Sequence, residues 1–210
     1  TIKTYLFCLK KFLRYCHKEP RRFNNTDLKE YLYKLKSKGV SGSTLNVHLN
    51  ALKLVMEHIL NKKFVVGIRY SKTPNRLPLV LSQEEVVKLI GAIENKKHSL
   101  MIKLMYGAGL RVSELVHLRV WDFEFEKNFG WVRNGKGGKD RLFIIAEEIN
   151  KELQNYIAEN NLLTNSWMFH GNKGRHLSQK SVYEIVKKAA KKSKIKKKVH
   201  PHTLRHSFST

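Results

Sequence analysis

The apolar residues of the first sixty positions recur every three or four places, and this periodicity constrains the fold more than any other feature of the chain. Such a spacing puts apolar side chains on one face of an α-helix. The segments with this pattern are residues 2–17, 26–38 and 43–60, and a shorter apolar piece follows at 64–68. We expect Thr26 to cap the second helix and Ser43 to begin the third. The pattern predicts a compact bundle of about four helices over residues 1–70.

The periodicity stops between Arg69 and Pro78, where two prolines stand among basic and polar residues. Such a stretch is typical of an exposed linker between domains. We therefore predict a helical domain over residues 1–70, a linker over 71–79 and a second domain over 80–210.

The second domain combines helical and strand-like patterns. Ser82 and Glu85 form a capping box at the start of a helix, and further helices are expected at 98–106, 147–160 and 179–193, the last opened by Ser178. Between residues 120 and 145, short β-prone runs alternate with turn residues, most strongly at 134–141. The predicted fold class is mainly α with a small antiparallel β-sheet of about three strands.

The charge of the chain indicates a class of partner. Its 41 Lys and Arg residues against 17 Asp and Glu residues give a net charge of +24. Residues 1–79 carry +13 and residues 80–210 carry +11, so both domains are basic. Nucleic acid is the first candidate partner, through neutralised phosphates, and an anionic membrane surface is the second. The content of 41% hydrophobic residues excludes a disordered basic tail, and the absence of an apolar run of 18 residues excludes a membrane span.

Cys8 and Cys16 are the two cysteines of the chain. Eight residues along a helix separate them by roughly 12 Å, which is too far for a disulfide. We expect free thiols in a reducing compartment, and hence a cytoplasmic protein.

Four side chains in the second domain suit chemistry on a phosphodiester, namely Arg111, Lys136, His202 and Arg205. Guanidinium groups match the non-bridging oxygens of a phosphate and stabilise the charge of a pentacoordinate transition state. A lysine on a hairpin can protonate a leaving oxygen, although Lys139 is an alternative holder of this role, and a histidine can move a proton near neutral pH. The sequence has no cluster of Asp and Glu residues of the kind that a two-metal nuclease needs, so a reaction without metal or nucleotide cofactor is expected. His200, His202 and His206 lack further zinc ligands at suitable spacing.

Three motifs appear in the second domain in a fixed order. They are Gly-Leu-Arg-Val-Ser-Glu-Leu at 109–115, Gly-Lys-Gly-Gly-Lys-Asp-Arg at 135–141 and Pro-His-Thr-Leu-Arg-His-Ser-Phe at 201–208. In order and spacing they resemble the tyrosine recombinase (phage integrase) family, and its Xer-type members most. The resemblance covers nearly the whole chain and implies a SAM-like core-binding domain before a catalytic domain.

The resemblance also implies roles for single residues. Arg111 and Arg205 match the two catalytic arginines, and Glu114 matches an acidic residue that supports the active site. Lys136 matches the hairpin lysine that acts as general acid toward the 5′ oxygen, and His202 matches the histidine of the family's His-x-x-Arg motif. The partner would be double-stranded DNA, bound by four protomers on two sites in the full reaction, with no metal and no cofactor.

One feature departs from the family pattern. Members continue to another His or Trp and then to the tyrosine that attacks DNA, whereas all eight tyrosines here precede His202. The chain is therefore expected to be a member without its C-terminal segment, which binds DNA but does not form the phosphotyrosyl bond by itself.

Residues that could contact DNA outside the catalytic set lie in both domains. Several polar residues on the third predicted helix, His48 among them, could contact a DNA groove. The alternative is that they form an ordinary polar helix face exposed to solvent. The candidates are Ser43, Thr44, Asn46, Lys53, Lys72, Lys139 and Arg141.

Other functions remain open from the sequence. They are a non-catalytic DNA-binding fragment or regulator derived from a recombinase, a general architectural or RNA-binding protein, and a type IB topoisomerase with the same chemistry.

Overall fold

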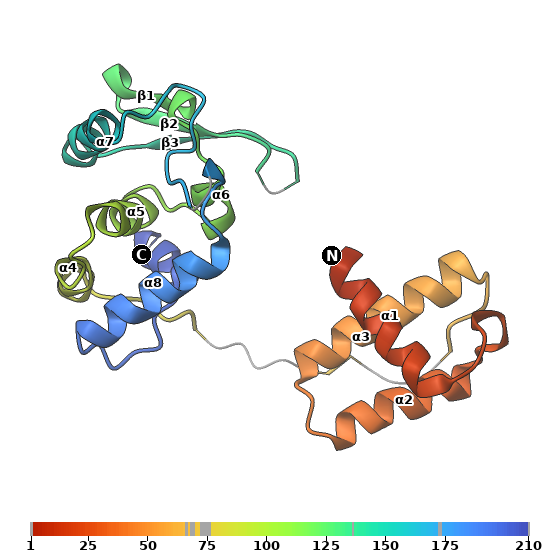
Figure 1. Cartoon of the computed structure of the whole chain (residues 1–210). Coiled ribbons are helices and arrows are strands. Elements are labelled where there is room, and N and C mark those ends of the chain that lie inside the picture. Colours follow the sequence, from red (N-terminus) through yellow and green to blue (C-terminus); the bar gives the residue numbers. More distant parts are fainter. Residues whose placement is uncertain are drawn as a thin grey trace. The chain divides into compact units, whose positions relative to one another are not determined.

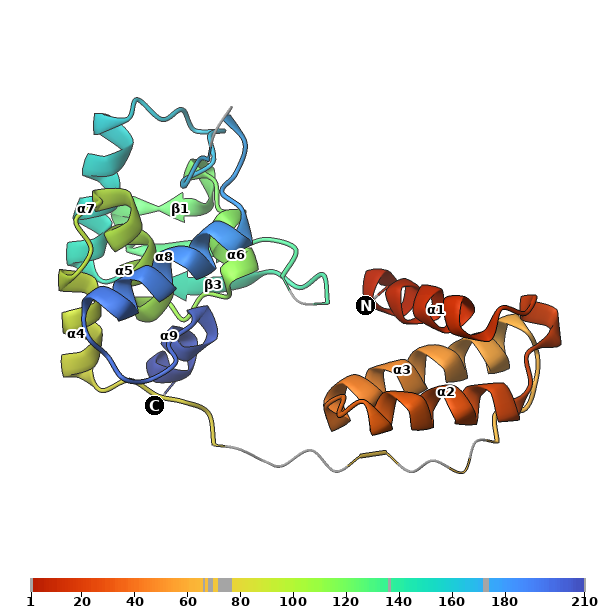
Figure 2. The ribbon, with the colours of Figure 1, turned by 60° about the horizontal axis from the view of Figure 1, so that its bottom comes forward.

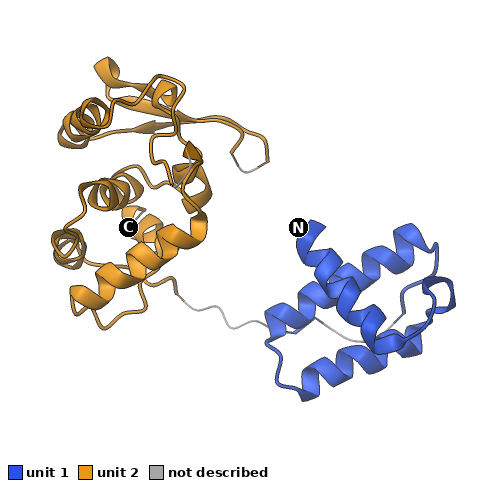
Figure 3. Ribbon diagram, in the orientation of Figure 1, with its two compact units in different colours: residues 1–76 blue, residues 77–210 orange. Residues whose placement is uncertain are grey.

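The computed structural model of the chain has two compact units, Thr1–Arg76 and Leu77–Thr210 (Figure 3). It describes residues 2–65, 67, 70–71, 77–135, 137–171 and 174–209. Most of the predicted linker, including Lys72, lies outside the described residues. Each unit encloses its own cluster of buried apolar side chains, as a domain that can fold by itself requires.

The first unit is a bundle of three α-helices in its described residues (Figures 1 and 2). They are α1 (Ile2–Cys16), α2 (Asn25–Ser37) and α3 (Gly42–Leu54), and α3 continues into one π-helical turn, η2 (Val55–Ile59). Each helix contacts the other two. The aromatic ring of Phe12 on α1 lies edge-on to Phe23, at 4.9 Å between centroids, and to Tyr31 of α2, at 5.3 Å. Apolar side chains at helical spacing thus form the core of this unit.

Two details of the predicted bundle are wrong. The helices α2 and α3 are capped by Asn24 and Ser41 rather than begun at Thr26 and Ser43; the Asn24 side chain accepts from the amide of Asp27. No fourth α-helix occurs among the described residues that follow η2, so the short apolar piece at 64–68 does not form one where it is described. A piece of five residues, one of them Gly67, is too short to offset the cost of starting a helix.

The second unit combines a group of helices with a small sheet that lies at one side of them (Figure 1). Its strands are β1 (Phe123–Glu124), β2 (Phe129–Val132) and β3 (Arg141–Ile144), which pair antiparallel in the order β1-β2-β3. Phe143 pairs with Gly130, and Arg141 pairs with Val132 at the base of the β2–β3 hairpin. Its helices are α4 (Gln83–Gly91), α5 (Lys96–Gly107), α6 (Val112–Val116), α7 (Glu147–Glu159), α8 (Gln179–Lys192) and α9 (Pro201–Phe208).

Helix α5 is the central element of this unit. Five of its residues are buried, Leu100, Met101, Ile102, Leu104 and Met105. They are not confined to one stripe, which is typical of a helix enclosed by neighbours. Accordingly, α5 contacts α4, α6, α7 and α9. This packing brings α6 and α9, which carry the first and third sequence motifs, against the same helix.

The predicted fold class is confirmed in this unit. The capping box of Ser82 and Glu85 and the cap by Ser178 are present, and the sheet has the predicted antiparallel strands. Strand β1 is only two residues long because a 3-10 turn precedes it and another follows it. Among the described residues, no helix combines the length and the apolar character needed to cross a lipid bilayer.

Candidate active site

The turn between α5 and α6 brings Arg111 into the site. Gly109 in this turn has φ +56°, a conformation that side chains other than glycine rarely adopt. A Cβ atom at Gly109 would lie 2.4 Å from the ring of Phe208 on α9, so the position also has no room for a side chain. Arg111 follows as the residue that caps α6, with its backbone amide bonded to Glu114 Oε2 at 2.9 Å. The first motif is therefore a tight turn that presents an arginine at the start of a helix.

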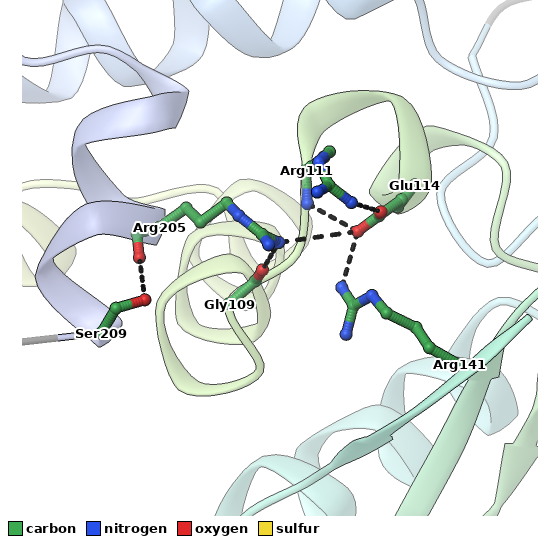
Figure 4. Close-up of polar contacts among 6 residues, drawn as sticks. All are labelled: Gly109, Arg111, Glu114, Arg141, Arg205 and Ser209. Carbon is green, nitrogen blue, oxygen red and sulfur yellow. Dashed lines mark hydrogen bonds and ion pairs between the residues drawn. The ribbon is translucent and has the colours of Figure 1, made fainter. Parts of the chain in front are cut away.

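The Glu114 carboxylate is the centre of a cluster of arginines (Figure 4). Its Oε1 accepts a hydrogen bond from Arg111 Nη1 at 2.5 Å, and its Oε2 accepts one from Arg141 Nη2 at 2.6 Å. Arg205 Nη1 lies 3.9 Å from Oε2. The Glu114 side chain is 5% exposed, whereas the three arginine side chains are 30–33% exposed. One buried acid therefore orients three guanidinium groups that still reach solvent.

Helix α9 brings Arg205 to this cluster from the far end of the chain. Arg205 Nη1 donates a hydrogen bond to the carbonyl oxygen of Gly109, so the third motif contacts the first directly. The helix is also tied to the start of the unit, because the amide of Leu81 donates to Ser207 Oγ at 2.9 Å. Ser207 in turn donates to the carbonyl oxygen of Thr203 at 2.8 Å. These buried bonds fix the position of the second arginine.

The electrostatic balance of the cluster favours an added anion. Burial by itself raises the pKa of Glu114, but the hydrogen bonds from the Arg111 amide and from the Arg141 and Arg111 side chains outweigh it, and the net pKa is lowered. Burial and the neighbouring Arg111 charge lower the pKa of Arg205. Three guanidinium groups share one carboxylate, which leaves an excess of two positive charges. A phosphodiester would compensate for part of this excess.

The histidines of α9 have different surroundings. His202 is exposed, one turn before Arg205 on the same helix. His200 precedes the helix, and its Nδ1 accepts from the amide of Thr203 at 3.3 Å. Burial, followed by the nearby His202 and His206, lowers the pKa of His200, which keeps the ring neutral and able to accept this bond. Within the described part of the chain, no three His, Cys, Asp or Glu side chains are grouped as a metal site would require.

The β2–β3 hairpin projects from the sheet in both views (Figures 1 and 2). Lys136, the predicted general acid, lies outside the described residues. The described part of the turn is closed by the Asn134 amide, which donates to Asp140 Oδ1 at 2.8 Å, and Lys139 is exposed. Arg141, predicted only as a DNA contact, joins the arginine cluster instead of pointing away from it. Its position at the base of the hairpin was the available signal in the sequence.

The candidate DNA contacts of the first unit lie along α3. Ser43 and Thr44 are exposed, and both hydroxyls lie within hydrogen-bond distance of Ser41 Oγ. The Asn46 amide is engaged at both ends by the backbone of Ser71, at 2.9 Å and 3.1 Å.

Two basic residues further along α3 differ in exposure. Lys53 is half-exposed and lies 4.0 Å from Glu57. His48 is buried, with its Nδ1 3.2 Å from the hydroxyl of Tyr31, so its placement with the polar face was wrong. Cys8 and Cys16 are free thiols, as predicted.

Comparisons with known proteins agree with the three motifs. The model of the phage integrase family matches residues 80–210, and that of the phage integrase N-terminal SAM-like domain matches residues 1–64. The tyrosine recombinase XerA of Pyrococcus furiosus is 38% identical over 215 residues, which cover 100% of this chain and 73% of that protein. The tyrosine recombinase XerD of Oceanobacillus iheyensis is 31% identical, with 100% and 77% covered.

Solved structures show the same relationship. The crystal structure of XerH recombinase in a pre-cleavage complex with its difH substrate matches 99% of this chain and 68% of that chain, with a TM-score of 0.78 and 26% identity. The crystal structure of XerA recombinase matches 100% of this chain and 76% of that one, with a TM-score of 0.59 and 30% identity. With family models matched in both units and a relative that is 38% identical over 100% of this chain, this chain belongs to the phage integrase family of tyrosine recombinases.

Proposed function

We propose that this chain is the DNA-binding and phosphate-holding part of a site-specific DNA recombinase of the tyrosine type. The observation that carries the proposal is the convergence of Arg111 and Arg205, from motifs far apart in the sequence, on the single buried carboxylate of Glu114. Exposed ion pairs contribute little to stability, so stability alone does not explain why two partly exposed arginines converge on one buried acid. Two oriented guanidinium groups suit the non-bridging oxygens of one scissile phosphate.

Each residue has a defined part in the proposed reaction. The hydroxyl of a tyrosine attacks phosphorus, the bond from phosphorus to the 5′ oxygen breaks, and a 3′-phosphotyrosine forms. Arg111 and Arg205 stabilise the added charge of the transition state, and Glu114 orients them. Lys136 protonates the departing 5′ oxygen, and His202 assists proton movement beside the phosphate. Attack by a new 5′-hydroxyl then reverses these steps, so neither metal nor nucleotide cofactor is needed.

Double-stranded DNA is the proposed partner. The support is the net charge of +24, which is shared by both units, together with the relative XerH, whose structure was solved on its difH substrate. In the complete recombination reaction we expect a homotetramer on paired DNA sites. Family membership and the two free thiols support a cytoplasmic location.

One alternative has an observation in its favour. The net charge of +24 supports DNA binding whether or not the arginine cluster is catalytic, so a non-catalytic DNA-binding fragment or regulator derived from a recombinase is the second candidate. Both candidates predict DNA binding. They differ in whether the arginine cluster accelerates phosphoryl transfer.

A joining reaction tests the proposal without requiring a tyrosine. The substrate is a pool of nicked duplexes with random flanking sequence, each carrying a 3′-p-nitrophenyl phosphate next to a 5′-hydroxyl at the nick. The 5′ oxygen attacks phosphorus, the nick is sealed and p-nitrophenolate leaves, which is measured by its absorbance and by the length of the strand. We expect the unsubstituted chain to join the strands, and Arg111→Ala or Arg205→Ala to slow joining by about 100-fold or more.

The control is Arg175→Ala, which removes an exposed arginine outside the cluster and should leave the joining rate unchanged. Binding of intact duplex should change by less than about threefold in all three variants, since each removes one charge of many. Duplex binding without any joining would favour the regulator. Equal rates in Arg111→Ala and Arg175→Ala would refute the proposed role of the cluster.

A further inference from the structure

Arg141 is the member of the arginine cluster that the proposed function leaves without a part. It is the first residue of β3 and pairs with Val132 at the base of the β2–β3 hairpin. Lys136 lies five positions earlier in the sequence, within the same hairpin. The backbone of Arg141 is thus part of the hairpin that contains the proposed general acid, and the contacts of the Arg141 side chain link this hairpin to other elements.

The side chain of Arg141 contacts Glu114, and through it the rest of the cluster. Its Nη2 donates to Glu114 Oε2 at 2.6 Å, and the same oxygen accepts the Arg111 amide at 2.9 Å. Glu114 Oε1 is occupied by the Arg111 guanidinium. The carboxylate is thus a bridge between the sheet and the first residue of α6 (Figure 4). Its two oxygens are both used, so the carboxylate cannot rotate to follow one arginine without weakening its bond to the other.

A second observation indicates that this orientation is imposed by the pair. Arg141 Nε is buried and has no hydrogen-bond acceptor among the described residues. A buried N–H group without an acceptor is costly, and one third of this side chain is exposed, so a different rotamer could hydrate the group. The bond to Glu114 outweighs that cost. It holds the guanidinium inward, toward the carboxylate, rather than outward as a residue that only contacts DNA phosphates would be.

We propose that Arg141 is a positioning residue for the phosphoryl transfer. Through Glu114 it couples the base of the hairpin to Arg111, so the hairpin and the phosphate-holding arginines reach their reactive arrangement together. This inference rests on the proposed function. It also assigns Arg141 a role different from the direct DNA contact that the sequence predicted.

The experiment compares Arg141→Gln with Arg133→Gln. Arg133 lies at the same end of the sheet, and its Nε bonds to Oδ1 of the buried Asp122 at 3.1 Å. Arg133→Gln therefore removes the same charge and a similar arginine–carboxylate pair without touching Glu114. In the joining assay at saturating protein, we expect Arg141→Gln to lower the rate by about 10- to 100-fold, as loss of a supporting contact does elsewhere, and Arg133→Gln to change it by less than about threefold.

Two further measurements identify how Arg141 acts. The double variant Glu114→Gln with Arg141→Gln should be about as slow as the slower single variant, since residues that act through one contact are not additive. The salt dependence of duplex binding should keep its slope in Arg141→Gln. A slope reduced by about one would mean that Arg141 neutralises a phosphate directly, and would overturn the inference. Additive losses, or equal losses in Arg141→Gln and Arg133→Gln, would also overturn it.

A separate readout keeps the inference testable if the unsubstituted chain does not join strands, an outcome that contradicts the proposed function. Nuclear magnetic resonance can follow the Glu114 carboxyl and the backbone amides of Gly137 and Gly138 in the hairpin. Arg141→Gln should raise the pKa of Glu114, and Glu114→Gln should increase the mobility of the two amides as Arg141→Gln does. If Arg133→Gln raises that pKa equally, or if the amides keep their mobility, the coupling does not exist.

Discussion

At the scale of single residues, Glu114 determines how the site is built. A carboxylate that is 5% exposed would be costly in isolation, and its cost is offset by the hydrogen bonds from Arg111 and Arg141 and by the nearby charge of Arg205. The residue touches no proposed reacting atom. It acts by setting the directions of side chains that do, which explains why a carboxylate is found in a cluster whose purpose is to hold an anion.

The lowered pKa of Glu114 leads to a prediction about stability and pH. A carboxyl group whose pKa is lower in the folded state stabilises the fold above its ordinary pKa of 4.5, and this contribution is lost as the pH falls through the folded value. Glu114→Gln should therefore lower the free energy of unfolding by about 3 kcal/mol at pH 7. The difference between the two proteins should shrink progressively below pH 4.5.

Urea denaturation of both proteins at a series of pH values measures this difference. Glu152→Gln serves as the control, because its ion pair with Lys103 is more exposed than that of Glu114. A difference between Glu114→Gln and the unsubstituted chain that stays constant from neutral to acidic pH would contradict the assignment.

The motifs in the sequence were sufficient to select Arg111, Glu114 and Arg205 as one group, and the structure brings these three together. The bond from Arg141 to Glu114 could not be predicted in the same way. Strand periodicity predicts the face of the sheet on which a side chain lies. It does not predict whether that side chain has the length and direction to reach a helix beyond the edge of the sheet. The burial of His48 was missed for a related reason: its partner, Tyr31, lies on another helix.

At the scale of elements, the docking of α9 is the condition for the site. The helix has eight residues, too short to be stable without tertiary contacts. Its position is set by α5 and α8, which it contacts, and by the bond between Leu81 and Ser207. His202 and Arg205 are therefore only as well placed as this helix is.

Ser207→Ala tests this dependence. The substitution leaves the buried amide of Leu81 without its acceptor, so the free energy of unfolding should fall by about 1–3 kcal/mol. The joining rate should fall as well, because Arg205 loses part of its support.

Thermal and urea unfolding measure the change in the free energy of unfolding of Ser207→Ala. The joining assay with the nitrophenyl substrate measures the change in its joining rate. The control is Ser209→Ala: Ser209 is exposed and its hydroxyl donates to the carbonyl oxygen of Arg205, so loss of this hydroxyl should cost less than about 0.5 kcal/mol. Equal losses in the two variants would argue against a specific docking role for Ser207.

Elements with strong local signals were predictable and weak ones were not. The capping box at Ser82 and the turn-rich hairpin were confirmed because they depend on residues next to each other in the sequence. The fourth helix predicted for the first unit is absent among the described residues after η2, where the apolar piece is short and contains Gly67. Strand β1 is short because its neighbours favour 3-10 turns, which periodicity alone does not distinguish from strand.

At the scale of the whole molecule, charge and chemistry are distributed differently. Both units are basic, whereas the residues proposed for catalysis all belong to the second. Substitutions in the first unit should therefore alter DNA affinity and leave the joining rate at saturating protein intact. DNA binding is thus proposed for both units and catalysis for the second unit alone. This division agrees with the separate family models that match the two units.

The positions of the tyrosines lead to a prediction for the 210-residue polypeptide. Because all eight precede His202, none stands where the family places its nucleophile. Incubation with a nicked suicide duplex, whose cleaved strand diffuses away, should give no protein–DNA adduct that survives denaturing electrophoresis. An adduct would contradict this prediction, and peptide mapping would then identify the attacking tyrosine. Joining of the nitrophenyl substrate in the same preparation is the control for folded protein.

The bond between Leu81 and Ser207 also has a consequence for biosynthesis. It links positions 126 residues apart, so the described part of the second unit cannot complete its packing until α9 has left the ribosome. Until then the apolar surface of α5 that α9 covers stays accessible, and the carbonyl oxygen of Gly109 lacks its hydrogen bond from Arg205. A nascent chain that stops before α9 therefore lacks Arg205, and the arginine cluster can form only after this helix has been synthesised.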